Sequence, residues 1–227
     1  MERHTIQVIA HIESDFKTKF GIPRQSGLVP ELTARVVFEP AYHSADALRG
    51  IEGFDRLWLI WQFSAAVTDG WRPTVRPPRL GGNARMGVFA TRSPFRPNPL
   101  GLSCVVLERV DRDAADGPAL VVSGADLMDG TPIYDVKPYV PYADAFPDAR
   151  GGFASATPET VAVDFPAPLL ARVAEDRRAA LLGVLAHDPR PRYQDDPARV
   201  YGMAFGAYEV RFRVADGVLT VVDVERA

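Results

Sequence analysis

The chain has 227 residues, of which 47% are hydrophobic and 24% charged, with a formal net charge of −3. Such a chain is long enough for one well-cored domain, or for one of about 150 residues with a smaller one beside it, and its net charge argues against a general polyanion binder. No segment approaches the roughly 18 uncharged apolar residues of a membrane helix, and no basic and apolar leader opens the chain, so we expect a cytoplasmic protein.

Short apolar stretches separated by Gly, Pro and Asp turns predict a series of strands in the N-terminal part. They are expected at residues 5–12, 34–38, 56–63, 86–91, 102–110 and 119–127, with a further strand-like segment at 136–142. One short helix is expected in SADALRGI, where Ser44 is a suitable N-cap and Asp46 lies in the first turn. The fold class is therefore mainly β, with an antiparallel barrel or sandwich over residues 1–146.

A change of composition follows this part. Residues 147–160 are small, polar and contain Gly and Pro, which indicates a linker. Residues 166–187 predict one long helix with a buried face formed by Leu170, Val173, Leu181 and Val184. Alternating residues on both sides of an Asp216-Gly217 turn predict a hairpin. Residues 161–227 are thus expected to form a small α+β domain.

Cysteine and histidine are few and scattered. The single cysteine, Cys104, lies in the apolar stretch LSCVVL, which excludes an intrachain disulfide and a thiolate metal cluster and predicts a buried, inert thiol. None of the four histidines has a neighbour at metal-ligand spacing, so no bound metal is expected.

Residues 70–107 contain no acidic residue. The stretch carries a charge of +6, so the rest of the chain carries −9; its cations are Arg72, Arg76, Arg79, Arg85, Arg92 and Arg96. Guanidinium groups are favoured where phosphate or carboxylate is bound bidentately. The alternative is that these arginines hold their own Pro-rich loops by bonding backbone carbonyls. The better explanation is an anionic partner, either nucleic acid or an acidic small molecule.

Three constrained segments are candidates for the functional site: PRQSG (23–27), residues 76–101 and residues 126–142. Their prolines restrict the loops before any ligand arrives, which lowers the cost of binding. The chain has no GxGxxG motif after a strand, no P-loop and no HExxH motif, so a doubly wound nucleotide-binding fold is disfavoured.

Asp135 and Lys137 are expected on one face of a strand because they are two residues apart. They form either a plain salt bridge or a pair that positions or deprotonates a substrate nitrogen. Tyr134, Tyr139 and Tyr142 nearby are either core residues or flat surfaces for a base.

Four stretches together closely resemble the TrmO-type tRNA methyltransferases of the TsaA-like family: PRQSGLV, GWRPTVRPPRLGGNARMGVFATRSPFRPNPLGLS, DLMDGTPIYDVKPYVPYAD and DPRPRY. The resemblance runs from about residue 5 to the C-terminus. It implies an S-adenosylmethionine-dependent enzyme built on a β-barrel, which methylates N6 of N6-threonylcarbamoyladenosine at tRNA position 37, next to the anticodon. It also implies a homodimer whose cofactor site lies near the subunit interface.

The resemblance implies the site residues as well. The cofactor contacts would come from Pro23, Arg24, Gln25, Ser64, Ala65, Arg92, Leu102, Asp126, Leu127, Met128, Asp129, Gly130, Thr131 and Pro132. Ser64 and Ala65 stand where the family carries a His-Gln pair, so only backbone contacts are expected there. Arg92 would be delivered by a barrel strand at GVFAT.

Proton removal from the acceptor N6 requires a base, for which Asp135 is the first candidate, or cationic stabilisation by Lys137 or an arginine. The residues expected to bind the acceptor and the anticodon loop are Arg76, Arg79, Asn83, Arg96, Tyr142, Arg190, Arg192 and Tyr193. Of these, Arg76, Arg79 and Arg96 would divide between the threonyl carboxylate and the phosphates.

Two other functions stay open at this point. One is an RNA-binding barrel without chemistry, since small barrels commonly bind RNA. The other is a methyltransferase that acts on a different small acceptor. The C-terminal unit would extend the tRNA footprint, cover the active site or hold only a docked loop.

Overall fold

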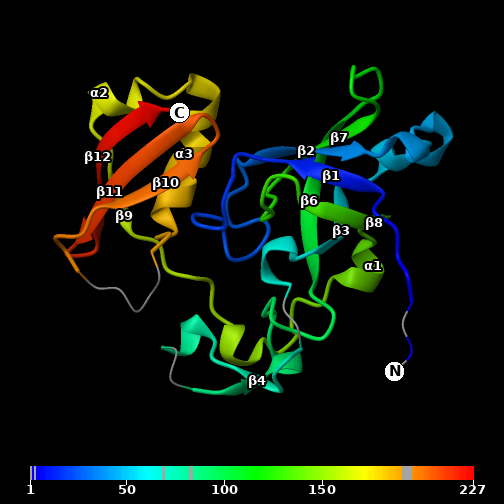
Figure 1. Ribbon diagram of the computed structural model, residues 1–227, viewed down its shortest axis with the longest axis horizontal. Coiled ribbons are helices and arrows are strands. Elements are labelled where there is room, and N and C mark those ends of the chain that lie inside the picture. The colour runs from blue at the N-terminus through cyan, green and yellow to red at the C-terminus, as the bar shows by residue number, and fades with distance from the viewer. Residues whose placement is uncertain (1, 3, 68–69, 82–83, 191–195) are drawn as a thin grey trace.

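Six antiparallel strands form a closed barrel in the N-terminal part of the chain (Figure 1). The structure, a computed structural model, describes residues 2, 4–67, 70–81, 84–190 and 196–227. The order around the barrel is β1-β2-β7-β6-β3-β8. The strands are β1 (Ala10–Glu13), β2 (Thr33–Phe38), β3 (Arg56–Gln62), β6 (Leu100–Asp111), β7 (Ala119–Ser123) and β8 (Pro132–Pro138). The predicted mainly β class with an antiparallel barrel is confirmed.

Every second side chain along a barrel strand points inward and helps to fill the barrel. On β3, Leu57, Leu59 and Trp61 point inward and are buried, while the residues between them are half-buried or exposed. β6 pairs with β3 in register, so that Gly101 lies opposite Trp61. A Cβ atom at position 101 would lie 2.2 Å from the indole of Trp61, so glycine is the residue that fits this place in the barrel wall.

The C-terminal part is a four-stranded sheet with helices packed against it. The sheet order is β10-β11-β12-β9, with β9 parallel to β12. The strands are β9 (Ala162–Asp164), β10 (Tyr201–Phe205), β11 (Tyr208–Ala215) and β12 (Val218–Arg226), and the helices are α2 (Ala167–Leu170) and α3 (Glu175–Ala186). Asp216 and Gly217 have φ values of 50° and 75°, as the two-residue turn of the predicted hairpin requires.

The long helix expected at 166–187 is in fact two helices. Ala174 is extended (φ −55°, ψ 139°) and donates its N–H to the Tyr208 hydroxyl at 2.9 Å, which ends the helical path before α3 begins. Of the four apolar residues predicted for its buried face, Val173, Leu181 and Val184 are buried, and Leu170 is half-buried. The predicted buried face is therefore present, but the apolar pattern does not indicate the break at Ala174.

The prediction that residues 86–91 form a barrel strand is wrong. β5 (Met86–Gly87) pairs only with β4 (Thr74–Val75), in a small two-stranded sheet that Figure 1 shows below the barrel, and a 3-10 helix follows at Val88–Ala90. After β5 the Val88 N–H still bonds the Pro73 carbonyl. Because proline has no N–H to donate, the backbone pairing between the two segments does not continue as a longer strand.

Smaller differences concern three other segments. The helix expected at SADALRGI is the 3-10 helix Ala45–Leu48, and Ser44 makes no side-chain cap. The strand-like segment after residue 136 ends at Pro138 and is followed by α1 (Pro141–Asp144). The first strand begins at Ala10 rather than Thr5. No helix within the described ranges is long and apolar enough to cross a membrane.

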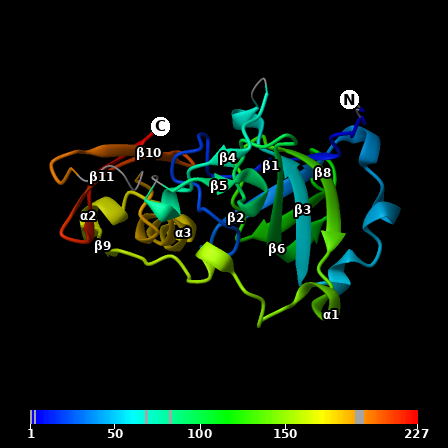
Figure 2. The ribbon, with the colours of Figure 1, turned by 90° about the horizontal axis from the view of Figure 1, so that it is seen from below.

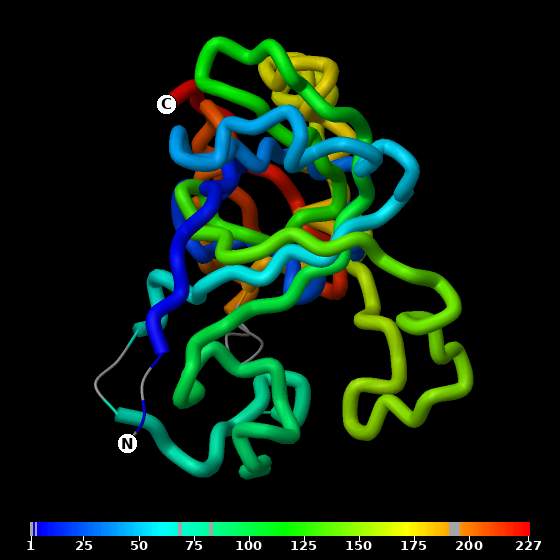
Figure 3. Tube along the Cα trace, turned by 90° about the vertical axis from the view of Figure 1, so that its right-hand side faces the viewer, coloured from blue at the N-terminus to red at the C-terminus, as the bar shows by residue number. Residues whose placement is uncertain are grey.

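Two separate hydrophobic cores result. One fills the barrel, and the other lies between the C-terminal sheet and α3. The second core also takes in residues from the loop 14–32 between β1 and β2, which is drawn in blue between the barrel and α3 in Figures 1 and 2. Figure 3 shows the β4–β5 segment and the linker 147–160 on the same side of the barrel.

Candidate functional site

Four segments that are distant in sequence meet at the barrel wall. The loop 14–32 supplies Gln25 and Ser26, the loop after residue 90 supplies Arg92, β6 supplies Ser103 and Cys104, and Asp126 follows β7. Arg92 donates to the Gln25 side-chain oxygen at 2.5 Å, and Ser26 Oγ accepts the backbone N–H of Cys104 on β6 at 3.1 Å. The structure thus brings together residues from several of the segments that the sequence singled out.

Asp126 is held by a polar chain that begins inside the barrel. The Trp61 indole N–H donates to Ser103 Oγ at 2.9 Å, and the Ser103 hydroxyl donates to Asp126 Oδ1 at 2.5 Å. Burial raises the pKa of Asp126 to about 6, against the opposing effects of the Ser103 hydrogen bond and the Arg92 charge. A carboxylate with a fixed orientation therefore lies close to an arginine.

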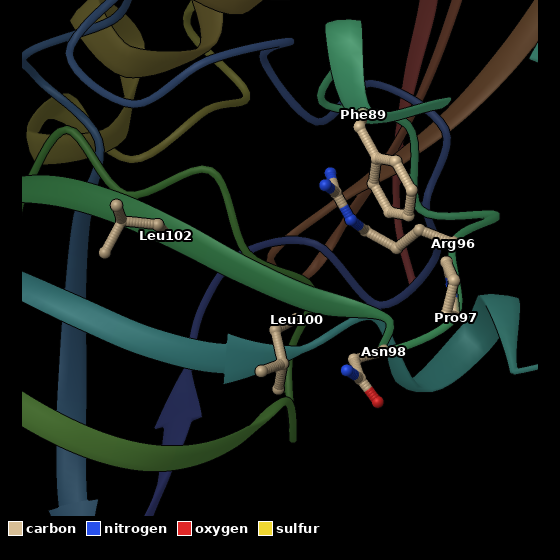
Figure 4. A pocket seen from close by; sticks show the side chains of 6 residues that line it. All are labelled: Phe89, Arg96, Pro97, Asn98, Leu100 and Leu102. Carbon is tan, nitrogen blue, oxygen red and sulfur yellow. The ribbon is translucent and has the colours of Figure 1, made fainter. Parts of the chain in front are cut away.

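A pocket of about 480 Å³ lies between the loop that carries Phe89 and Arg96 and the start of β6 (Figure 4). Its lining residues are Phe89, Arg96, Pro97, Asn98, Leu100 and Leu102. In Figure 4 the ring of Phe89 lies next to the side chain of Arg96, while Leu100 and Leu102 follow β6 along the other wall. Leu102 is 53% exposed, so the pocket offers an apolar surface and one guanidinium to a ligand.

Asp135 and Lys137 lie on the same outer face of the barrel as Leu102. Asp135 pairs across β8 and β3 with Ile60, which in turn pairs with Leu102 on β6. Because neighbouring strands lie about 4.8 Å apart, Asp135 is roughly 10 Å from the Leu102 position. The predicted salt bridge exists, with Lys137 Nζ 2.9 Å from Asp135 Oδ2, and both side chains are exposed.

The segment Asp126–Pro132 is fastened to the start of the loop 14–32. Asp129 accepts the backbone N–H of Ser14 at 2.9 Å and the Lys17 ammonium at 2.8 Å. The Ser14 hydroxyl donates to the Leu127 carbonyl. Thus the Asp129 carboxylate already has two partners within the protein.

The other residues expected at the cofactor site fall into two groups. Leu127 and Thr131 are buried, as is Pro23, whereas Met128 and Pro132 are half-buried. The exposed residues are Arg24, Gly130, Ser64 and Ala65, of which the last two lie in a 3-10 helix (Ser64–Ala66) that follows β3.

The acid-free stretch presents its arginines without acidic partners. Within the described ranges no ion pair involves any of its six arginines. At least four of them bond the protein itself: besides the Arg92 contact to Gln25, Arg79 donates to the Ala156 carbonyl, Arg96 to the Thr91 carbonyl and Arg85 to the Thr74 hydroxyl. Some arginines of this stretch therefore hold its loops in place. Within the described residues, their positive charges are not neutralised by ion pairs.

The family of the chain follows from comparison with known proteins. The tRNA-methyltransferase O N-terminal domain matches residues 11–145, and the TrmO C-terminal domain matches residues 158–227. The chain belongs to the TrmO family. It is 43% identical to the tRNA (adenine(37)-N6)-methyltransferase of Escherichia coli over 99% of both chains.

Other TrmO relatives agree over almost the whole length. A putative S-adenosylmethionine-dependent methyltransferase of Pseudomonas aeruginosa is 40% identical over 97% of both chains. A crystal structure of TrmO from the same genus superimposes with a TM-score of 0.81 at 34% identity, covering 100% of this chain and 99% of that one.

The residues expected to bind RNA in this TrmO-family chain differ in how exposed they are. Tyr142 lies on α1 and is fully open to solvent, with 92% of its surface exposed. Arg190 forms an ion pair with Asp188 at 2.9 Å and is mostly buried. The predicted contacts Asn83, Arg192 and Tyr193 lie outside the described residues.

Sequence reasoning missed an aromatic pair beside the pocket. Trp71 and Phe89 lie with ring centroids 5.9 Å apart and are 50% and 72% exposed. The sequence did indicate this pair, because Trp71 and Phe89 are aromatic residues within the acid-free stretch. Ser103 was also missed, and its signal was a hydroxyl at an inward position of an apolar strand.

Two further findings concern reactivity. Cys104 is half-buried rather than buried, and its pKa is raised by burial, with Arg56 opposing, so it is a poor nucleophile. Among the described residues there is no group of three His, Cys, Asp or Glu side chains that could hold a metal.

Proposed function

We propose that this chain is an S-adenosylmethionine-dependent tRNA methyltransferase that methylates N6 of adenosine 37, with N6-threonylcarbamoyladenosine as the acceptor. The single observation that carries the proposal is that Arg92, from the acid-free stretch that also lines a pocket, lies close enough to the buried Asp126 carboxyl to act on its charge. Membership of the TrmO family supports it. We assign the catalytic role to residues 1–146 and a supporting role to residues 161–227.

The donor set fits S-adenosylmethionine. Its methionine part carries an ammonium and a carboxylate, which Asp126 and Arg92 complement, and its adenine suits the apolar wall of Leu102 and Phe89. When bound, the cofactor supplies a methyl group activated by a sulfonium. Gln25 holds the Arg92 side chain in place through its hydrogen bond. The remaining cofactor residues inferred from the family, including Pro23 and the segment 127–132, would contribute mainly through their backbone.

Alignment would provide most of the catalysis, because methyl transfer is an in-line displacement. The acceptor nitrogen is a poor nucleophile whose proton must be removed. Asp135 pairs with Lys137 and is open to solvent on the Leu102 face. We therefore propose that Asp135 accepts this proton and that Lys137 stabilises the developing negative charge.

The arginines would bind the RNA. Arg96 lines the pocket and is the candidate for the threonyl carboxylate, whereas Arg76 and Arg79 lie farther along the same stretch and are candidates for anticodon-loop phosphates. The exposed Trp71–Phe89 pair adds surfaces on which unstacked bases can lie.

We further propose that the chain acts as a homodimer in the cytoplasm. Leu100 and Leu102 are 38% and 53% exposed on the outer face of β6, next to the half-buried Ile60 of β3. A strip of this kind beside a ligand pocket suits a subunit contact. Sedimentation analysis of the chain and of Leu102→Glu tests this: the wild type is expected to be a dimer and the variant a monomer.

Calorimetry distinguishes the proposed function from its two alternatives. The proposed enzyme binds both S-adenosylmethionine and tRNA, and it transfers labelled methyl only to threonylcarbamoylated tRNA. An RNA-binding barrel without chemistry would bind tRNA and give no heat with the cofactor. A methyltransferase for another small acceptor would bind the cofactor and not require tRNA.

A further inference from the structure

The loop 14–32 belongs to the barrel by sequence but to the C-terminal unit by packing. It connects two barrel strands, yet its buried residues Phe16, Val29 and Leu32 are part of the C-terminal core and not of the barrel core. Phe20 and Ile22 pack against the same core. Both limbs of the loop are therefore anchored outside the domain in which the loop begins and ends.

The first limb is anchored to β10, α3 and the turn after β10. The Phe16 ring meets Phe205 edge-on, with centroids 5.9 Å apart. The Asp15 carbonyl accepts the N–H of Gly206 at 2.7 Å. The Asp15 carboxylate, only 12% exposed, pairs with Arg177 of α3 at 2.9 Å, and Arg177 also donates to Thr33 at 3.3 Å, where β2 begins.

The second limb is anchored to α3 and its C-terminal end. Gly183 lies so close to Val29 that a Cβ at position 183 would be 2.6 Å from a Val29 methyl carbon. The ring of His187 hydrogen-bonds the Leu28 carbonyl at 3.0 Å. The contact therefore depends on a small residue in α3 and on a side chain at the helix end.

The loop touches the barrel at its two ends, where Asp129 holds Ser14 and Lys17 and the Gly124 N–H bonds the Leu32 carbonyl, and again at its tip. The Gly27 N–H bonds the Gly124 carbonyl at 2.8 Å, next to the Asp126 segment. Ser26 and Gln25 make the contacts to Cys104 and Arg92 described above. The tip thus lies at the proposed cofactor site, while the two limbs that carry it are fixed by another unit.

We propose that the C-terminal unit positions the cofactor loop, and that Arg177 is a positioning residue for S-adenosylmethionine binding. This inference rests on the proposed function for the identity of the cofactor. If the anchors are weakened, a smaller fraction of molecules holds Gln25 and Ser26 in the binding conformation, and the apparent Kd rises in inverse proportion to that fraction. The C-terminal unit then contributes to cofactor binding without touching the cofactor.

Point variants test this better than truncation, because deletion of the C-terminal unit would expose the buried loop residues Phe16, Val29 and Leu32. The test variant is Arg177→Gln, which removes the pairing with Asp15. The matched control is Arg172→Gln, since Arg172 pairs with Asp223 at 3.1 Å entirely within the C-terminal unit.

Calorimetry on the full-length protein measures cofactor binding by each variant. We expect Arg177→Gln to raise the Kd for S-adenosylmethionine about 3- to 10-fold and Arg172→Gln to leave it within about 2-fold. The double variant Asp15→Asn/Arg177→Gln is expected to match Arg177→Gln, because the two residues act as one pair.

Hydrogen exchange of the protein without cofactor is the second measurement. Arg177→Gln is expected to increase exchange at residues 16–28, and Arg172→Gln is not. Equal cofactor affinity and equal loop exchange in the two variants would overturn the inference, as would a loss confined to tRNA affinity. If the wild type binds no S-adenosylmethionine, the proposed function fails, and the exchange data alone still decide whether the anchor exists.

Discussion

The loop 14–32 and the segment 63–99 reach the same site but are held in opposite ways. The first buries apolar side chains in the C-terminal core and has paired charges at Asp15 and Lys17. Among the described residues of the second, Pro77 and Val88 alone are buried, and the strands are the two-residue β4 and β5. Its arginines have no ion pair within the described ranges.

This difference assigns the two ligands to different physical mechanisms. A loop that is fixed by packing is preorganised, which favours tight and specific binding of a small cofactor. A stretch with uncompensated arginines attracts a polyanion over a distance and loses that attraction in salt. Arg92 belongs to the second segment but is held by Gln25 of the loop. Variants of Arg92 and of the other arginines are therefore expected to separate cofactor affinity from tRNA affinity.

Arg92→Ala is expected to have the largest effect. Loss of a charge-assisted contact costs about 2–3 kcal/mol, so S-adenosylmethionine affinity should fall roughly 30- to 150-fold, with turnover falling in parallel. Calorimetry measures this, and Arg85→Ala in the same segment is the control. Equal cofactor affinity in the two variants would contradict the assignment of Arg92.

The double variant Arg72→Gln/Arg76→Gln tests whether the acid-free stretch binds tRNA. We expect tRNA affinity to fall about 10-fold at low salt, and the slope of log affinity against log salt to decrease by roughly 0.7–0.9 per lost phosphate contact. Cofactor affinity should be unchanged. The control is Arg49→Gln/Arg112→Gln, which removes the same charge from arginines that pair with Asp46 and Glu52. An identical salt slope in both double variants would remove the RNA role from this stretch.

Trp71→Ala distinguishes stacking from charge. Base stacking on an aromatic ring contributes about 1–3 kcal/mol, so tRNA affinity should fall at least about 5-fold while the salt slope stays the same. Filter binding at several salt concentrations measures both quantities. A Trp71→Phe variant that behaves like the alanine variant would argue against stacking.

The smallest effect is expected on the stability of the cofactor-free protein, where Asp126→Asn changes its pH dependence. The folded state holds the Asp126 proton more tightly than the unfolded state, because the pKa is raised from 3.8 to about 6. Ionisation therefore lowers stability as the pH rises from about 4 to 6, and the whole cost is present above that range. Asparagine avoids this cost and still accepts the Ser103 hydrogen bond.

The expected result is a Tm a few degrees above that of the wild type at pH 7.5, with the difference disappearing toward pH 4. Thermal unfolding at several pH values measures it. A constant Tm difference at all pH values would show that the Asp126 carboxyl titrates normally.

The barrel and its site segments could be predicted from the sequence because local patterns encode them. Alternating residues such as Leu57 and Leu59 mark strands, and prolines mark the loops that carry the site. The strand expected at 86–91 failed because Val88 and Phe89 are both apolar, although only Val88 is buried. Periodicity cannot distinguish these two environments within so short a stretch.

The anchoring of the loop 14–32 could not be predicted for a different reason. Its partners, among them Arg177 and Phe205, lie more than 160 residues away along the chain, and no local pattern pairs Phe16 with a sheet in another unit. The polar chain from Trp61 through Ser103 to Asp126 also depends on strand register, which the sequence does not reveal.

The central claim is tested most directly by mass spectrometry of nucleosides. Threonylcarbamoylated tRNA is incubated with the protein and S-adenosylmethionine, digested and compared with unmodified tRNA treated in the same way. The proposed function predicts that N6-threonylcarbamoyladenosine gains the mass of one CH₂ and that the unmodified tRNA gains none. An unchanged mass of that nucleoside, with a protein that binds both ligands, would contradict the proposal.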